Sequence, residues 1–216
     1  MTNNKRIILW CGLALLIALI LNSFDIYANY EAVSSNGSDE ILWSAMFFLV
    51  IPLLAIVFVV IPISLIGVIF KRSRRVSVLL LMSCVIYLGV AKACFWCSGK
   101  VRMAAFHKLA ERSKTLVQAI KEYELRYGNL PASLENLVPE FLPNIPQTGM
   151  GAYPEYEYKV GEEAQEFAKD AWCLVVNTPL GGLNWDIFIY FPNQDYTECG
   201  WGGVLEKVKD WAYVHE

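Results

Sequence analysis

Two of the six cysteines, Cys94 and Cys97, have the Cys-x-x-Cys spacing of a thiol redox pair. Some membrane thiol oxidoreductases carry such a pair at the membrane boundary, so a membrane redox enzyme is one hypothesis for this chain. The flanking residues are apolar and give no thioredoxin-like context. We therefore favour the other interpretation, in which both cysteines are ordinary residues of a helix at a membrane surface.

Cys173 and Cys199 are a second candidate pair. Cys173 lies in a run typical of a β-strand, and Cys199 adjoins the glycine-rich stretch Gly200–Gly203. The topology argued below places both outside the cytoplasm, where cysteines tend to pair. We predict a Cys173–Cys199 disulfide that fastens the last loop to the sheet, with two separate thiols as the alternative. Cys11 and Cys84 lie in apolar segments and are expected to fill space.

The remaining polar residues form no recognisable catalytic or metal-binding motif. The two histidines, His107 and His215, have no potential ligands at metal-binding spacing. No Ser/His/Asp arrangement is suggested. We therefore expect no catalytic residue, no metal and no cofactor, and hence a protein that is not an enzyme.

Charge is divided unevenly along the 216 residues. Residues 1–97 contain seven of the 18 Lys and Arg and four of the 21 Asp and Glu, whereas residues 98–216 are rich in acids. The mean hydropathy of +0.38 is high for a soluble protein. We predict a membrane domain over residues 1–97 and an aqueous domain over residues 98–216. The acidic balance of the second excludes nucleic acid as a partner, because phosphate binding needs a basic surface.

Three apolar segments of the membrane domain are long enough to cross a bilayer. They are expected at residues 7–24, 43–68 and 76–97. The second belongs to an uncharged run from Ile41 to Phe70, which we interpret as one tilted span with interfacial ends. Pro52 and Pro62 lie inside it, and each is expected to bend the helix because proline removes a backbone donor.

The first apolar segment has two interpretations. Lys5 and Arg6 precede it, and a basic start followed by an apolar run also marks a cleaved secretory signal, here residues 1–28. A signal peptidase site needs small residues, but the best match, ending at Ala28, begins with the large Ile26. We favour a retained span.

Four basic residues between the second and third spans set the expected topology. They are Lys71, Arg72, Arg74 and Arg75. The positive-inside rule places them, like Lys5 and Arg6, in the cytoplasm, so that the acidic loop Asp25–Glu40 lies outside. We expect a multi-pass protein of a bacterial inner membrane, with a cytoplasmic N-terminus and a periplasmic C-terminal domain. The lipid bilayer is one partner, and the basic cluster is also suited to anionic lipid.

The aqueous domain begins with a helical pattern. Apolar residues recur at helical spacing from Val101 through Ala105 and Leu109 to Tyr127, so that residues 76–127 are expected to form one continuous element, half anchor and half domain spine. Gly128 is a helix stop.

A short turn and a run of strands are expected after this helix. Ser133 is a plausible cap for the turn Ser133–Leu137. Strands are expected at Tyr156–Val160, Trp172–Asn177, Asp186–Phe191 and Trp211–Val214. This order predicts an α+β domain, with a small antiparallel sheet packed on the long helix. Its many aromatic residues are expected to fill the core; an exposed stacking platform for a cell-wall ligand is the alternative.

The residues from about 101 to 146 resemble type IV pilin-like proteins, and especially the major pseudopilin of type II secretion systems. The matching residues are Ile120, Tyr123, Tyr127, Gly128, Leu130, Pro131, Ser133, Leu134, Leu137, Leu142 and Pro146. The resemblance implies a pilin-like domain whose long helix continues from the third span. The chain departs from the family by its two additional spans, and around Arg74–Leu81 it has neither the glycine cleavage site nor the glutamate that pilin assembly uses.

The resemblance also implies a role and one ligand. In the pseudopilin family a calcium ion braces a loop of the last part of the domain, where this chain has Asp186, Asp195 and Glu198, but their pattern gives no residue-by-residue match. The expected role is a non-enzymatic interaction or assembly module with a protein partner in the cell envelope. The alternatives are the redox protein using Cys94 and Cys97, and a sensor of an envelope ligand.

Overall fold

A computed structural model describes residues 3–180, 185–196 and 203–215. The chain forms two compact units. The first comprises Met1–Glu31 and Asp39–Val101, and the second comprises Ala32–Ser38 and Arg102–Glu216. Unit 2 therefore begins four residues beyond the expected boundary, and it includes a short segment from the N-terminal part of the chain.

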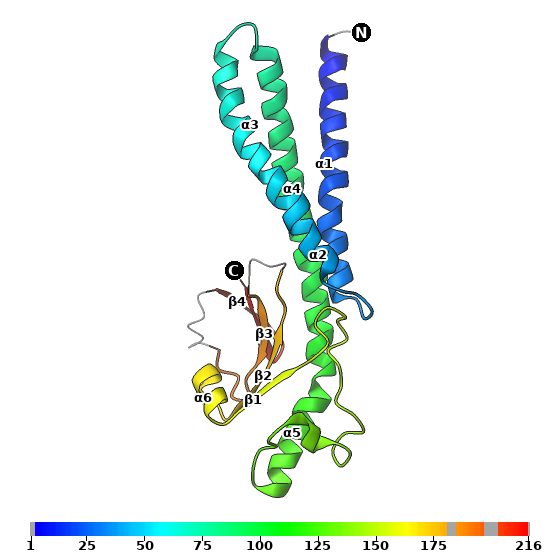
Figure 1. Cartoon of the computed structure of the whole chain (residues 1–216), viewed down its shortest axis with the longest axis vertical. Coiled ribbons are helices and arrows are strands. Elements are labelled where there is room, and N and C mark those ends of the chain that lie inside the picture. Colours follow the sequence, from blue (N-terminus) through cyan, green and yellow to red (C-terminus); the bar gives the residue numbers. More distant parts are fainter. Residues whose placement is uncertain (1–2, 181–184, 197–202, 216) are drawn as a thin grey trace. The chain divides into compact units, whose positions relative to one another are not determined.

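Long apolar helices make up unit 1 (Figure 1). They are α1 (Asn3–Val33), α2 (Glu40–Ala45), the π-helix η1 (Met46–Val50), α3 (Ile51–Ile69) and the first part of α4 (Arg74–Arg112). Within the described residues, three helical stretches are long and apolar enough to cross a membrane: Lys5–Val33, Glu40–Ile69 and Arg74–Tyr127. The three apolar helices that the sequence predicts are thus present.

The expected polar loop Asp25–Glu40 is wrong over its first half, because α1 continues to Val33. No glycine or proline interrupts this stretch, and the Asn29 side chain donates to the Asp25 carbonyl at 2.9 Å, within the helix. The Asp25 carboxylate accepts a hydrogen bond from Ser98 of α4 at 2.5 Å. This contact uses polar groups that the sequence assigned to solvent.

The second apolar helix is irregular where proline requires it. Pro52 occupies the start of α3, directly after the π-helical turn Met46–Val50. A π-turn absorbs a helical residue whose backbone N–H is missing, since it shifts the hydrogen-bond register. Pro62 lies inside α3.

The basic turn between α3 and α4 also has a structural role. Ser73 donates its hydroxyl to the Gly67 carbonyl at 2.8 Å, and Arg74 donates Nε to the Val68 carbonyl at 3.1 Å. These side chains satisfy carbonyls at the end of α3 that the helix itself leaves without partners. A Cβ on Gly67 would lie 2.2 Å from the Ser77 hydroxyl oxygen, so a larger residue there would force the Ser77 side chain to move.

The long helix of unit 2 is interrupted once. The end of α4 at Arg112 is followed by Ser113 and then by α5 (Lys114–Tyr127). Ser113 keeps helical angles (φ −68°, ψ −15°), so the element expected over residues 76–127 is nearly continuous.

The end of α5 and the turn that follows it agree with the sequence. Gly128 ends the helix in the left-handed conformation (φ 70°), as expected, and donates its N–H to the Glu124 carbonyl. The expected short turn is the 3-10 helix η2 (Leu134–Leu137), capped where the Ser133 N–H donates to Asn136 at 3.0 Å.

Five antiparallel strands form the sheet, in the order β1-β2-β3-β5-β4. Their bounds are β1 (Glu157–Val160), β2 (Trp172–Asn177), β3 (Ile187–Tyr190), β4 (Val204–Val208) and β5 (Trp211–His215). The expected α+β class and antiparallel sheet are confirmed. The sequence analysis predicted neither β4 nor the short helix α6 (Glu162–Ala168).

Each face of the sheet is covered by a different layer. On one face, Phe106 of α4 contacts the rings of Phe188 and Tyr213 at centroid distances of 4.8 and 4.7 Å, and Phe188 stacks on Trp211 at 4.9 Å. On the other face, α6 and the segment after β3 cover a core of small, aliphatic and aromatic side chains. These are Ala164, Ala168, Cys173, Val175, Ile187, Ile189, Phe191, Tyr196, Ala212 and Val214.

The aromatic residues of the sheet are mostly buried. Those exposed by less than a tenth include Trp172, Phe188, Tyr190, Trp211 and Tyr213. Among the described residues they leave no exposed aromatic row, although Trp185 is 39% exposed, and Trp201 lies outside the described residues; the stacking platform for a cell-wall ligand therefore gains no support here and stays a prediction.

The segment Ala32–Ser38 packs on a turn of unit 2. Gly151 donates its N–H to the Ser34 carbonyl at 2.7 Å, and Ala152 donates to the Ala32 carbonyl at 3.2 Å. A Cβ on Gly151 would lie 2.2 Å from the Gly37 carbonyl oxygen, so only glycine fits this backbone contact. The loop between the first two apolar helices is therefore a part of the sheet-bearing unit.

Candidate functional site

The thiols of Cys94 and Cys97 differ in exposure. Both lie in α4, where Cys94 is buried and Cys97 is exposed, and neither is in a disulfide. Neither sulfur has a hydrogen-bond partner among the described residues. Redox chemistry needs an accessible thiolate that a nearby base or cation stabilises. The geometry gives the redox hypothesis no added support, and it stays a prediction to be tested.

The predicted Cys173–Cys199 disulfide falls partly outside the described residues, because Cys199 is not among them. Cys173 is fully buried on the α6 side of the sheet, and burial raises the pKa of its thiol to about 12. It has no disulfide partner among the described cysteines. The pairing therefore stays a prediction.

The residues expected to set the topology lie on exposed helix ends. Lys5 and Arg6 are in the first turns of α1, and Lys71, Arg72 and Arg75 flank the start of α4. Apart from the contact of Arg74 with a carbonyl, none of the six pairs with a described residue. Their charges are accessible to water or to lipid headgroups.

Arg102 is a buried charge that the sequence analysis missed. It lies in the last part of α4, is 2% exposed, and donates to the Thr178 carbonyl at 2.5 Å and to the Tyr153 hydroxyl at 3.4 Å. Its guanidinium carbon lies 5.4 Å from the centre of the Phe106 ring. Such contacts are what a buried cation needs to offset its desolvation.

A second buried polar pair lies nearby. The Asp186 carboxylate is 1% exposed and accepts a hydrogen bond from the Tyr213 hydroxyl, and its negative charge favours the cationic form of Arg102. Tyr153 in turn donates its hydroxyl to the Pro179 carbonyl at 2.8 Å. The cluster joins the helix to the segment after β2, which is a structural task.

Ser113 makes a second polar link between the long helix and the sheet. Its fully buried hydroxyl donates to the Ala110 carbonyl at 3.0 Å and accepts the Trp211 indole N–H at 2.9 Å. The interruption of the helix thus coincides with its hydrogen bond to β5.

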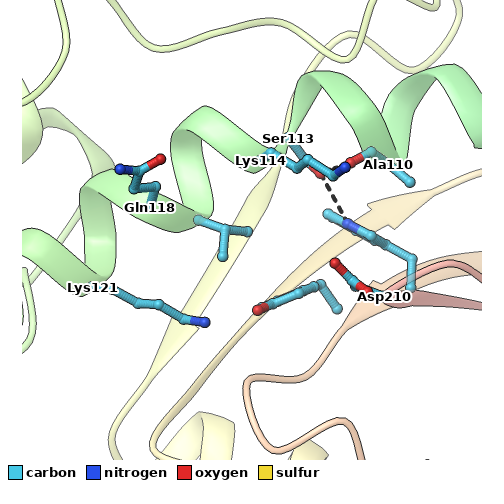
Figure 2. Close-up of a pocket in the computed structure, with 9 residues that line it drawn as sticks. Ala110, Ser113, Lys114, Gln118, Lys121 and Asp210 are labelled. Atoms are coloured by element: carbon cyan, nitrogen blue, oxygen red, sulfur yellow. Dashed lines mark hydrogen bonds between the residues drawn. The ribbon is translucent and has the colours of Figure 1, made fainter.

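An open groove of about 260 Å³ lies beside this link, between α5 and the start of β5 (Figure 2). Its lining residues are Ala110, Ser113, Lys114, Val117, Gln118, Lys121, Tyr190, Asp210 and Trp211. The helix contributes two lysines and an amide at spacings of three and four residues, which place them on one face. The strands contribute two aromatic rings and, in the turn before β5, a carboxylate.

Charges around the groove are only partly balanced. Lys114 donates to Glu111 at 2.9 Å, and Lys209 also donates to Glu111. Hydrogen bonds from Lys114 and Lys209 lower the pKa of Glu111 to about 2. Neither Lys121 nor Asp210 has a side-chain hydrogen bond or ion pair among the described residues, although the charge of Asp210 favours the cationic form of Lys114, so both side chains can still bind a ligand.

A metal site is not formed by the described residues, which contain no group of three His, Cys, Asp or Glu side chains that could hold an ion. Glu198, one of the three acids considered for calcium, lies outside them.

No protein family, no curated protein and no solved structure matches the chain.

Proposed function

We propose that this chain is an integral, multi-pass protein of a bacterial inner membrane that presents unit 2 to a protein partner in the cell envelope, without catalysing a reaction. One observation carries the proposal. The helix α4 is apolar and exposed in its first part, and in its last part it supplies Arg102, Phe106 and Leu109 to the core of the sheet-bearing unit. An anchor and a domain spine in one helix suit a protein that holds a folded domain at a membrane surface.

Exposed apolar surface supports the membrane location. Phe48 is 83% exposed, Phe58 77% and Ile69 72%. Many other apolar residues of unit 1 are also exposed. Burial of apolar surface is worth roughly 25 cal/mol per Å², so helices with such faces are unstable in water but suited to lipid. Each helical stretch is longer than the roughly 20 residues that the hydrocarbon core requires.

The orientation follows from charge. The exposed basic turn around Lys71 and Arg72 and the basic start of α1 belong in the cytoplasm by the positive-inside rule. The segment Ala32–Ser38 and the rest of unit 2 then belong in the periplasm. The hydrogen bonds of Gly151 and Ala152 to this segment support the assignment, because both partners must lie on one side of the membrane.

Reporter fusions test the topology. Alkaline phosphatase and a fluorescent protein are fused separately after residues 36, 73 and 216, and each pair of activities reports the side of the membrane. The expected result is outside, inside, outside. Any other order refutes the orientation, and the mass of the mature N-terminus decides between a retained first span and a cleaved signal.

Site-specific photo-cross-linking tests the interaction role. Leu125 of α5 is 85% exposed, so a photoreactive amino acid at this position can reach a partner of unit 2. Phe48 is the matched control, because it is similarly exposed but lies in unit 1. A discrete adduct from position 125 and not from position 48 supports the proposal. Monomers alone, from position 125 and from other exposed sites of unit 2, contradict it.

The pilin-like character of unit 2 is part of the proposal. A long helix, the stop at Gly128, the short helix η2 and an antiparallel sheet support it. A shared fold does not bring a shared function. Since the glycine cleavage site is missing around Arg74–Leu81, we expect no pilin-type processing before α4, and a shortened chain that begins there would contradict this expectation.

A further inference from the structure

We propose that the groove between α5 and the turn before β5 binds a small zwitterion, an amino acid or a short peptide, whose carboxylate faces Lys121 and whose ammonium group faces Asp210. The groove lies entirely in unit 2. The proposal therefore depends neither on the topology nor on the protein partner proposed above, and goes beyond both.

The two available charges lie on opposite walls. Lys121 extends from α5 toward the strands, and Asp210 stands on the strand side of the groove (Figure 2). Both are exposed, and neither has a side-chain hydrogen bond or ion pair with a described residue, although the charge of Asp210 also favours the cationic form of Lys114. A ligand with one charge of each sign satisfies both walls, whereas a simple anion or cation satisfies one and is repelled by the other.

The other groups that could attract an anion are already engaged. Lys114 is held by Glu111, which also accepts from Lys209. The Trp211 N–H donates to Ser113, and Gln118 donates its amide to Glu122 at 2.9 Å. The groove thus offers one available cation and one available anion, which disfavours ligands of high negative charge such as nucleotides.

One more donor lies beside the groove. The Tyr190 hydroxyl has no hydrogen-bond partner among the described residues, although the residue is only 4% exposed and lines the groove. Its oxygen is accessible from the groove rather than fully buried, so the hydroxyl would donate a hydrogen bond to a ligand carboxylate beside Lys121.

The size of the groove limits the ligand. A volume of about 260 Å³ is below the roughly 300–1,000 Å³ of sites for drug-sized molecules. The Trp211 ring, Ala110 and Val117 give it an apolar lining that suits a peptide backbone or a small side chain. We therefore expect the site to hold one to three residues.

Calorimetric titration of the full chain in detergent tests the proposal, with glycine, diglycine and triglycine as probes. Each added residue moves the ammonium group from the carboxylate by up to about 3.3–3.6 Å, so the best length reports the span between the two walls. Acetate and methylammonium are the single-charge controls. We expect saturable binding of at least one of the three probes, and binding of both controls weaker by about tenfold or more.

Two variants and two matched controls locate the binding. Lys121→Met and Asp210→Asn should each weaken the best probe by about 10- to 100-fold, as loss of one charge-assisted hydrogen bond does. Lys108→Met and Glu155→Gln remove equally exposed charges elsewhere in unit 2 and should change nothing. The proposal is overturned if none of the three probes binds, if acetate binds as tightly as the best probe, or if the control variants weaken binding as much as the groove variants.

Discussion

Replacement of Arg102 should reveal how much the buried cation stabilises unit 2. Arg102→Ala removes the donors to the Thr178 carbonyl and to the Tyr153 hydroxyl, and leaves a cavity beside Phe106. Hydrogen bonds from a charged group contribute about 1.5–3 kcal/mol, and disruption of a buried charge pair costs about 3–5 kcal/mol. Asp186, whose charge lies near the guanidinium, would remain buried. We expect a loss of about 3–5 kcal/mol.

Arg102→Met separates packing from charge. Methionine keeps most of the apolar volume of the side chain, and it also removes the Nε group, which has no hydrogen-bond partner among the described residues. Apolar replacements of buried ions are often far less costly than truncations. We expect Arg102→Met to cost about half as much as Arg102→Ala.

Hydrogen exchange followed by mass spectrometry is the suitable assay, because it reports the stability of β2 and β3 while unit 1 stays in detergent. A loss of 3 kcal/mol accelerates exchange by about 150-fold. Lys108→Met, an exposed change on the same helix, is the control and should have no effect. If Arg102→Ala accelerates exchange by less than about fivefold, the reasoning is refuted. Such a result would mean that the buried contacts of the guanidinium do not offset its desolvation.

Three further changes test other contacts. Gly151→Ala places a methyl group against the Gly37 backbone and should cost about 1–3 kcal/mol, measured as faster hydrogen exchange in residues 32–38; Gly161→Ala, where a Cβ meets nothing but φ is positive, controls for backbone strain alone. Glu111 has its folded pKa lowered to about 2, so its contribution to stability is full above about pH 4.5 and is lost as the pH falls toward 2. Glu111→Gln should therefore be less stable than the parent at pH 7 and equal to it near pH 2, and a constant difference across this range would contradict the ion contacts. Cys94→Ser with Cys97→Ser should leave growth and localisation unchanged, and alkylation with mass spectrometry should find both thiols reduced; an oxidised pair would revive the redox hypothesis.

Local signals were read correctly from the sequence because they act within a few residues. Gly128 ends the helix by adopting a positive φ, and Ser133 caps a turn with Asn136, so neither depends on distant parts of the chain. The three apolar helices were predicted for the same reason, since hydropathy is a property of a short window.

The face of the long helix that packs on the sheet was harder to predict. The stripe from Val101 through Ala105 to Leu109 is less buried at its start than the one that begins at Arg102 and Phe106. The spacing of apolar residues selects the stripe that begins at Val101, because arginine is treated as a polar residue. The stripe that begins at Arg102 is stable only because distant loops supply partners for the guanidinium. The helical spacing of residues 102, 106, 109, 113, 116 and 120 could have identified the buried face of the helix, but only if an arginine was accepted as a buried residue.

Strand β4 was missed for a related reason. Its sequence, Val204–Val208 with Glu206 and Lys207 at its centre, lacks the apolar run expected of a strand, and all but its last residue are exposed. Charged side chains are common on edge strands, because they discourage pairing with the strands of other chains. The groove could not be predicted from the sequence either. Lys121 and Asp210 lie almost ninety residues apart, and only the fold brings them to the lining of one groove.

The backbone contact between Ser34 and Gly151 constrains the order of events during synthesis. The two residues are 117 positions apart, and a bacterial ribosome adds about 5–20 residues per second. The segment Ala32–Ser38 must therefore wait for roughly 6–23 s before its partner turn emerges. In that interval it has none of its final hydrogen bonds to this turn, and two further apolar helices are made. The first residues of unit 2 to be synthesised thus stay without these hydrogen bonds until the rest of the apolar helices and the long helix have been made, but they can gain them before any strand of the sheet is complete.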